Sequence, residues 1–508
     1  MGTFTRPWGL LLTSLPFDNS YARLPEPFYA RIDPQGVSKP SIVRINGPLA
    51  EQLGLDAAWL ASPDGLAMLA GNAFPKEADP IAMVYGGHQF GGWSGQLGDG
   101  RAVLLGEIVG RDGVRRDLQL KGSGPTPFSR RGDGRSPIGP VIREYLLSEA
   151  MAALGVPTTR ALAAVATGEP VFREEALPGG VLARVATSHV RVGTFEHFRA
   201  QGDVERLREL TDSVIDRHYP ETREAERPAL ALLESVIGRQ ADLIAQWMLL
   251  GFIHGVMNTD NMQIAGETID FGPCAFMEAF DPGTVFSSID QHGRYAWGNQ
   301  PSIGQWNLTR LAEALLPLID AEEDAAVEAA KSVLVGFGAR FNAVFLGGFE
   351  EKLGLAKGTL HASSDDSEQE TDFLTQTFGV LKEQQVDFTL FFRQLTRIAA
   401  GEEPDVLREL FDDSKEADRW LATWHDAVGG SGGPDAARLA RMRARNPIFI
   451  PRNHRVEQAI QAAARGDYAP FERMTTVWER PYQEQPEHAD LEDTPATGER
   501  VTRTFCGT

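Results

Sequence analysis

The chain has 508 residues, of which 42% are hydrophobic, and it carries a formal net charge of -21. This size allows a sizeable core in more than one folding unit, whereas the acidic balance argues against a nucleic-acid partner, which needs a cationic surface. The two cysteines, Cys274 and Cys506, are too few for a disulfide scaffold or a four-cysteine zinc site. The most apolar long stretch, residues 228–252, carries three charged side chains, so we expect a buried helix, no membrane partner and a cytoplasmic location.

The first part of the chain predicts a β-rich unit. Residues 1–80 hold many prolines and short apolar runs, and they should wrap around the core without regular structure. Glycines and β-forming residues follow, and they predict strands around Arg191 and at Ala102–Glu107, Asp117–Lys121 and Val181–Val185. A loop at Gly122–Pro140 precedes a helix at Val141–Leu154, where apolar residues recur every three or four positions.

The rest of the chain predicts a helical unit. Apolar spacing predicts helices at Val204–Arg217, Pro228–Phe252, Leu308–Ile319, Ala321–Phe345, Val386–Ala400 and Lys415–Ala427. Gly429–Pro434 predicts a flexible break, and the acidic residues after 481 predict a mobile tail. We therefore expect an α+β chain with an N-terminal extension (1–80), a β-rich lobe (81–202), a helical lobe (203–481) and a flexible tail (482–508). This is the bilobal layout of a protein kinase, although layout alone is weak support.

A glycine-rich stretch, Tyr85–Arg101, lies directly before the first predicted strand. Glycines let the backbone approach a ligand closely, and successive N–H groups in such a turn can bind an anion. The alternative is a flexible surface loop. Because a strand with Arg101 at its start follows directly, we favour contact with a phosphate.

Lys121 ends a predicted strand, and Glu144 lies 23 positions later on the predicted helix. Protein kinases use a strand lysine to hold ATP phosphates and a helix glutamate to orient that lysine. The alternatives are a solvated lysine and a surface carboxylate. The order and spacing of the two residues favour the kinase-like pair.

The segment His254–Met262 is followed by an Asp-Phe-Gly sequence that begins at Asp270. In kinase-like enzymes a loop aspartate orients the attacking hydroxyl, while a nearby asparagine and the aspartate of Asp-Phe-Gly bind the metal. Asp260, Asn261 and Asp270 match these residue types, and Mg²⁺ prefers such oxygen ligands. The segment therefore predicts a metal–nucleotide site.

The pattern also departs from an ordinary kinase. Asp260 directly precedes Asn261, whereas several residues separate the two in kinases, which argues against transfer of the γ-phosphoryl group. Arg184 and Arg191 lie seven positions apart and either bind phosphate or form surface ion pairs. Asp133 and Gly134, in a loop rich in arginine, are either turn residues or ligand contacts.

Several long motifs together resemble the selenoprotein O family of protein adenylyltransferases. These motifs are Tyr85–Arg101, Leu120–Pro127, Arg131–Ser136, His254–Met262, Asp270–Cys274, Asp290–Asn299, Trp306–Leu311 and Asn446–Glu457. The family has a protein-kinase-like fold that binds ATP in a flipped orientation. It moves AMP from ATP to Ser, Thr or Tyr hydroxyls of other proteins, and some members are described as moving UMP from UTP.

The resemblance implies a role for each candidate residue. Asp260 would accept the proton, Asn261 and Asp270 would hold Mg²⁺ or Mn²⁺, and Lys121 paired with Glu144 would bind phosphate. Arg184 and Arg191 would contact the flipped phosphate tail. The residues implied to line the nucleotide pocket are Gly98, Gly100, Arg101, Asp133 and Gly134.

The resemblance also bears on the two cysteines. Animal members carry selenocysteine third from the C-terminus, where this chain has Cys506, and the corresponding cysteines of bacterial relatives can pair. A Cys274–Cys506 disulfide that changes activity, with redox-related acceptor proteins, is one hypothesis, and two unrelated thiols are the other.

Two other functions stay open at this point. The first is a kinase that moves the γ-phosphate. The second is an inactive pseudokinase that only binds nucleotide, which the complete set of candidate residues argues against.

Overall fold

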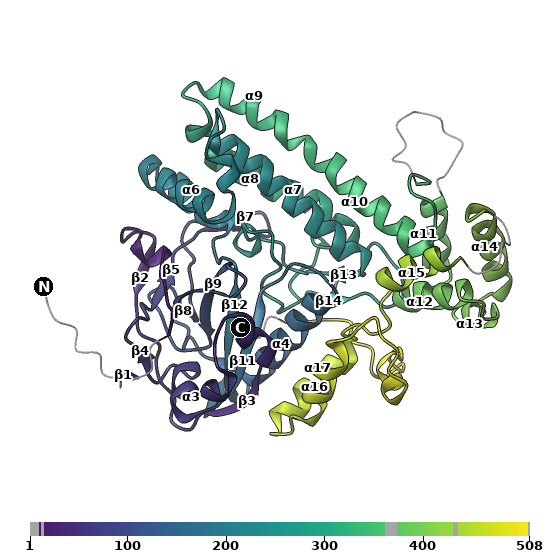
Figure 1. Ribbon diagram of the computed structural model, residues 1–508, viewed down its shortest axis with the longest axis horizontal. Coiled ribbons are helices and arrows are strands. Elements are labelled where there is room, and N and C mark those ends of the chain that lie inside the picture. The colour runs from purple at the N-terminus through teal and green to yellow at the C-terminus, as the bar shows by residue number, and fades with distance from the viewer. Residues whose placement is uncertain (1–9, 12–14, 361–372, 430–434, 506–508) are drawn as a thin grey trace, which may run out of the picture.

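An antiparallel sheet and a helical region lie side by side in the computed structural model (Figure 1), which describes residues 10–11, 15–360, 373–429 and 435–505. The main sheet has eight strands in the order β2-β5-β8-β9-β12-β11-β3, with β10 paired to β12. The bounds are β2 (Tyr29–Arg31), β3 (Ser41–Ile45), β5 (Ile81–Met83), β8 (Ala102–Val109), β9 (Arg115–Lys121), β10 (Ser136–Pro137), β11 (Arg160–Phe172) and β12 (Ala176–Ala186).

The predicted strands at 102–107, 117–121 and 181–185 are confirmed as parts of β8, β9 and β12. The prediction of a strand around Arg191 is wrong, because Arg191 forms one isolated bridge with Gln263 and then caps helix α5 (Val192–Ala200). Sequence reasoning did not find β11, whose alanine-rich start favours a helix by propensity. Its burial between β3 and β12 overrides that propensity.

The N-terminal segment is more regular than expected. It contributes β2 and β3 to the main sheet, and it holds the short helices α1 (Gly47–Gln52), α2 (Ala57–Leu60) and α3 (Pro63–Leu69). Leu49, Leu60 and Met68 from these helices share a core with Leu105 of β8. The neighbouring Leu104 joins the other core, on the opposite face of the sheet, because successive strand residues point to opposite faces.

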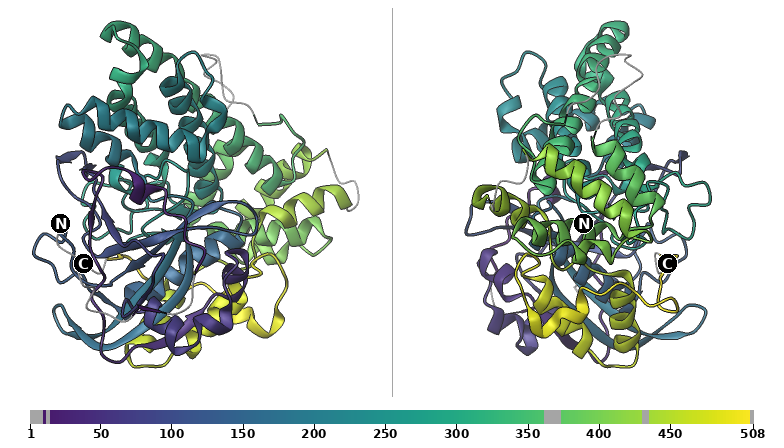
Figure 2. Two further views of the ribbon diagram at one scale, coloured as in Figure 1. Left: turned by 60° about the vertical axis from the view of Figure 1, so that its left-hand side comes forward. Right: turned by 90° about the vertical axis from the view of Figure 1, so that its right-hand side faces the viewer.

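Helix α4 (Ile138–Ala153) covers that opposite face and connects the sheet to the helical region. Figure 2 shows the sheet on one side of the molecule and the long helices on the other. The bounds are α6 (Val204–His218), α7 (Pro228–Leu249), α8 (Gln300–Ile319), α9 (Glu323–Leu334), α10 (Gly336–Leu353), α11 (Phe373–Glu383), α12 (Phe388–Ala399), α13 (Asp405–Arg408), α14 (Ser414–Ala427), α15 (Ala436–Arg445), α16 (Asn453–Ala464) and α17 (Ala469–Trp478).

The predicted helices are present, but their bounds differ, and α11, α13, α15, α16 and α17 were not predicted. Helix α7 ends at Leu249, before its predicted end at Phe252, because Phe252 begins strand β13 (Phe252–Ile253). Helix α8 begins eight residues before its predicted start, at Gln300, and the predicted helix 321–345 is divided between α9 and α10 at Val335. By length and composition alone, Glu323–Leu353 is apolar enough to cross a membrane, with 22% of its most apolar window buried. A mostly exposed helix of this kind is weak support for a membrane span.

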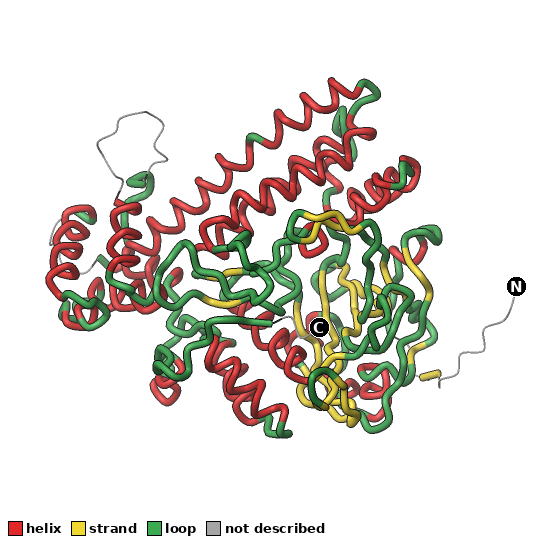
Figure 3. The backbone as a smooth tube through the Cα atoms, turned by 180° about the vertical axis from the view of Figure 1, so that it is seen from behind, coloured by secondary structure: helices red, strands yellow, loops and turns green. Residues whose placement is uncertain are grey.

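The C-terminal segment was expected to be mobile, but up to Phe505 it lies against the rest of the protein. Leu491, at the end of a 3₁₀ helix, is buried, and Thr504 pairs with Ser287. Figure 3, a view from behind, shows loops in green between the strands and the long helices. The acidic composition predicted exposure, and it could not predict these long-range contacts.

A buried lysine gives the helical region a pH-dependent stability. Lys352 of α10 is 3% exposed, and burial lowers the pKa of its ammonium group to about 7. The charged form therefore costs folding free energy at and below pH 7, and this cost disappears as the pH rises toward the pKa of the unfolded chain. We expect Lys352→Met to raise the free energy of unfolding by about 2 kcal/mol at pH 6.5, and by less at pH 9.5. Urea unfolding at both pH values checks this, and an equal gain at both would contradict it.

Candidate active site

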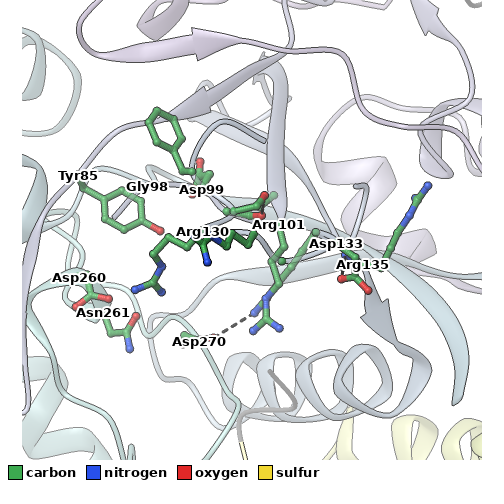
Figure 4. A pocket seen from close by; sticks show the side chains of 18 of the residues that line it. Tyr85, Gly98, Asp99, Arg101, Arg130, Asp133, Arg135, Asp260, Asn261 and Asp270 are labelled. Atoms are coloured by element: carbon green, nitrogen blue, oxygen red, sulfur yellow. Dashed lines mark hydrogen bonds and ion pairs between the residues drawn. The ribbon is translucent and has the colours of Figure 1, made fainter. Parts of the chain in front are cut away.

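A cavity of about 680 Å³ lies where the sheet meets the helical region, and it collects most of the predicted site residues (Figure 4). They come from the start of β8, the end of β9, β12 and the loop that follows α7. The predicted residues in its lining are Gly98, Gly100, Arg101, Lys121, Asp133, Gly134, Arg184, Arg191, Asp260, Asn261 and Asp270. Segments up to 172 residues apart in the sequence therefore meet around one cavity.

Lys121, in the lining of the cavity, is held by two carboxylates. Its Nζ donates to Oε2 of Glu144 at 2.5 Å and to Oδ1 of Asp270 at 3.1 Å. Glu144, which is buried on α4 behind the lining, also accepts from Arg184 at 3.1 Å. Burial alone would raise the pKa of Glu144, but the charges of Lys121 and Arg184 outweigh burial and lower it. The predicted pair therefore exists as part of a larger buried network.

Asp270 occupies an unusual backbone conformation, with a φ of 67°. Aspartate tolerates this left-handed region better than most residues, and such strain often marks functional sites. Burial would raise the pKa of its carboxyl, but the cations Lys121, Arg101 and Arg184 lower the pKa well below its usual range. Asp270 is therefore a fixed negative charge that faces the cavity.

Asn261 and Asp270 have the chemistry of Mg²⁺ or Mn²⁺ ligands. The Nδ2 of Asn261 donates to the carbonyl of Val256, which leaves its Oδ1 as the atom available to a cation. Within the described ranges, no group of three or more His, Cys, Asp or Glu side chains is placed to hold a metal. A hard cation bound by one carboxylate and one amide would need phosphate oxygens and water as further ligands, which is common for Mg²⁺.

Asp260 is 7% exposed, and its carboxylate is held from one side only. Gln89 donates to its Oδ2 at 3.0 Å, whereas its Oδ1 is buried with no hydrogen-bond partner. Burial raises the pKa of this carboxyl to about 6, against the opposing effects of Gln89 and Arg191. A carboxylate with one free oxygen and a raised pKa suits a proton acceptor.

The two ends of the glycine-rich stretch have different positions in the structure. Its end, Gly98–Arg101, lines the cavity as predicted, but its start forms the hairpin of β6 (Gly87–Gln89) and β7 (Gly92–Ser94) against the loop that carries Asp260. In that hairpin, His88 N–H donates to Thr259 Oγ1 and Phe90 N–H donates to Asn258 Oδ1. Gln89 was not predicted as a site residue, because its contact lies 171 positions away.

The close approach of this hairpin depends on Gly87. A Cβ at this position would lie 2.9 Å from both Cβ and Oδ1 of Asp260. We expect Gly87→Ala to displace the Asp260 carboxylate and to lower kcat by about tenfold to a hundredfold, because catalysis is sensitive to shifts of about 1 Å. Nucleotide affinity should change little. The matched control is Gly92→Ala in the same hairpin, where the nearest atom to a new Cβ is a carbonyl oxygen at 3.4 Å; equal kcat values for the two variants would contradict the prediction.

Three arginines of the lining form no hydrogen bond or ion pair within the part of the chain that the structure describes. No hydrogen bond or ion pair engages the guanidinium groups of Arg101, Arg130 and Arg131 among the described residues. Overall the lining holds eight basic and four acidic side chains, in a chain whose net charge is -21. This local cationic cavity suits a polyanion such as a nucleotide triphosphate.

Some of the lining residues were not predicted from the sequence, and one residue that was predicted forms an ion pair within the protein. Asp133 forms an ion pair with Arg173 at 2.8 Å, so its carboxylate is committed to the hairpin between β11 and β12. Arg130 and Arg131 stand in the same arginine-rich motif that drew attention to Asp133, and both have positive φ. Tyr85, stacked 4.4 Å below the Arg191 guanidinium, also went unpredicted, although its position in the glycine-rich stretch was a signal.

Of the two cysteines, only Cys274 lies within the described residues. Its thiol is fully buried and donates to the carbonyl of Phe271 at 3.3 Å, and burial raises its pKa to about 12. Cys506 lies outside the described residues, so the predicted pair stays a prediction.

Comparison with known proteins finds one matching family and several similar sequences. The family described as "Protein adenylyltransferase SelO" matches residues 11–479. Proteins named "Protein nucleotidyltransferase YdiU" are 58% identical in Rhodopseudomonas palustris (strain BisB5) and 57% identical in Rhizobium etli (strain CIAT 652). The alignments cover 97% of this chain and 99% and 97% of these relatives, respectively. In Bradyrhizobium sp. (strain ORS 278), a protein of the same name is 56% identical over 97% of this chain and 99% of its own length.

Proposed function

The chain belongs to the protein adenylyltransferase SelO family, and from that premise we propose that it transfers AMP from ATP to Ser, Thr or Tyr hydroxyls of other proteins. It is thus an enzyme, a protein nucleotidyltransferase. The observation that carries the proposal is the set of unpaired cations, Arg101, Arg130 and Arg131, which face the same cavity as Asp260 and Asp270. They can bind a triphosphate beside an acid–base group.

In the proposed mechanism, Lys121 and the unpaired arginines bind the phosphates, and Glu144 holds Lys121 and Arg184 in place. The carboxylate of Asp260 accepts the proton of the attacking hydroxyl, whose oxygen forms a bond to the α-phosphorus. The bond from the α-phosphorus to the bridging oxygen breaks, and pyrophosphate leaves. Asn261 and Asp270 would hold Mg²⁺ or Mn²⁺, which neutralises charge on the phosphoryl oxygens. Arg184 and Arg191 would bind the phosphate tail in a flipped orientation.

We also propose a kinase-like division of the chain, with residues 81–202 as the nucleotide-binding lobe and residues 203–481 as the catalytic lobe. The support is the strand lysine, the helix glutamate and the two loop aspartates that meet at one cavity, as in kinases. Residues 1–80 would then be an extension that completes the sheet.

The identity of the transferred group can be tested directly. The protein is incubated with casein as a generic acceptor, Mg²⁺ or Mn²⁺, and ATP labelled at the α- or the γ-phosphate. Label from α-labelled ATP alone is the expected result. Label from γ-labelled ATP alone would make the protein a kinase, and no label with intact ATP binding would favour an inactive binding module. A parallel reaction with α-labelled UTP measures whether UMP is transferred as well.

The cysteine pair is proposed as a redox switch. In the cytoplasm, our proposed location, both thiols would rest reduced. Oxidised glutathione would accept two electrons and two protons from Cys274 and Cys506 as the disulfide forms. The tail supports this idea, because the Thr504 hydroxyl donates to the carbonyl of Pro273, next to Cys274. Mass mapping after exposure to oxidised glutathione should find the linked peptides, and two free thiols would overturn the idea.

A further inference from the structure

A second cavity, of about 880 Å³, opens beside the first. The edge common to both is charged and polar, and it is made by Arg101, Arg130, Arg173, Asp260, Asn261 and Asp270. Away from this common edge, the lining of the second cavity is largely apolar and includes Phe90, Ile138, Leu177, Val256, Ile289 and Phe505. An apolar surface offers a triphosphate neither charges nor hydrogen bonds. This side of Asp260 therefore suits a different substrate.

We propose that the second cavity binds an extended segment of the acceptor protein, and that the C-terminal segment Arg503–Phe505 of this chain occupies part of the same site. This inference rests on the proposed function, because it assigns the place from which a protein hydroxyl reaches Asp260. The acceptor segment would bind as a single extended strand in which a residue with a hydroxyl group is next to a large apolar residue, as Thr504 is next to Phe505 in the tail.

The backbone pairing of the tail identifies the kind of occupant. Thr504 N–H donates to the carbonyl of Phe286 at 2.8 Å, and Ser288 N–H donates to the carbonyl of Thr504 at 3.0 Å. The two segments of the chain run parallel at Ser287 and Thr504. This pairing resembles the addition of a strand to a sheet edge. In that mode of binding, main-chain hydrogen bonds supply affinity, and neighbouring pockets select the side chains of the bound segment. A main-chain site of this kind can accept segments from many proteins.

The exposed apolar side chains around the cavity point to the same use. Phe90 is 36% exposed, Ile289 is 57% exposed and Phe505 is 69% exposed. All three line the second cavity, and they come from the β6–β7 hairpin, the loop after β14 (Ala275–Phe276) and the tail. Large apolar side chains gathered at the mouth of a cavity are typical of a protein-binding surface. Phe505 contributes a side chain of the tail to a surface whose other two members belong to the body of the protein.

If the tail and the acceptor compete, releasing the tail must improve acceptor binding. Thr504→Pro removes the N–H that bonds to Phe286 and also the hydroxyl that bonds to Pro273. Because an attached competitor acts at a high effective concentration, we expect the KM for casein to fall about fivefold, while the KM for ATP stays unchanged. The matched control is Thr502→Val, which changes an exposed hydroxyl of the same tail. Both proteins are assayed with α-labelled ATP in the presence of a thiol reductant.

A binding measurement separates docking from catalysis. A fluorescent peptide with the sequence of residues 501–505, blocked at both ends, should bind the Thr504→Pro protein, and it should bind the Ile289→Glu/Thr504→Pro protein about tenfold more weakly. Unlabelled peptide should compete with casein but not with ATP. Peptide binding without any AMP transfer would support the docking site and overturn the proposed function. Transfer with unchanged KM values and no peptide binding would overturn the docking site and leave the function intact.

Discussion

Replacing Asp270 by asparagine is expected to lower the rate of AMP transfer by about a thousandfold without unfolding the protein. Asp270 is one of the two oxygen ligands proposed for the metal, and the only one with a charge. Its backbone φ of 67° makes asparagine a cleaner replacement than alanine, because asparagine also tolerates the left-handed region. Substrate positioning by the arginines should survive in the variant, so the loss should appear in kcat.

Incorporation of α-labelled phosphate into casein measures this effect across a titration of Mn²⁺. The matched control is Asp112→Asn, which changes an aspartate in the exposed turn between β8 and β9, paired with Arg116 at 2.7 Å. The control should keep full activity. A turnover for Asp270→Asn within about tenfold of the original protein would contradict the metal assignment.

Replacing Glu144 by alanine is expected to lower the free energy of unfolding by about 3 to 5 kcal/mol. Glu144 is the common partner of Lys121 and Arg184, whose side chains are 12% and 4% exposed. Without it, Gln119 and Asp270 are the hydrogen-bond partners that remain for Arg184 and Lys121, respectively, among the described residues. Two nearly buried cations would then face each other with less compensation. We expect the loss of Glu144 to weaken ATP binding as well, because Lys121 is no longer held from α4.

Urea unfolding and calorimetric binding of a non-hydrolysable ATP analogue measure these two effects. The matched control is Glu328→Ala on α9, where an exposed glutamate pairs with Lys331 three positions later at 2.8 Å. That change should cost less than about 0.5 kcal/mol, as exposed pairs do. Equal costs for the two variants would show that the buried network adds nothing to stability.

The site residues that could be predicted are those whose order and spacing in the sequence follow the motifs of kinase-like enzymes. Lys121 and Glu144 were placed on a strand and a helix, and the structure brings them into contact at 2.5 Å. The short distance between Asp260 and Asp270 in the sequence likewise put them at one cavity. Asp133 shows the limit of such reasoning, because its partner Arg173 lies 40 positions away.

The sequence by itself determined the α+β class, several of the long helices and the family, because apolar periodicity and local motifs are encoded within short stretches of chain. Only the tertiary structure decided which charges stay unpaired and which oxygen of Asp260 is free. It also decided where the tail lies and which strands residues 1–80 add to the sheet. These features depend on contacts between segments far apart in the chain, such as Gln89 with Asp260 and Thr504 with Phe286. The free energy of a side chain depends on its burial and its partners, and neither is a property of the neighbouring residues in the sequence.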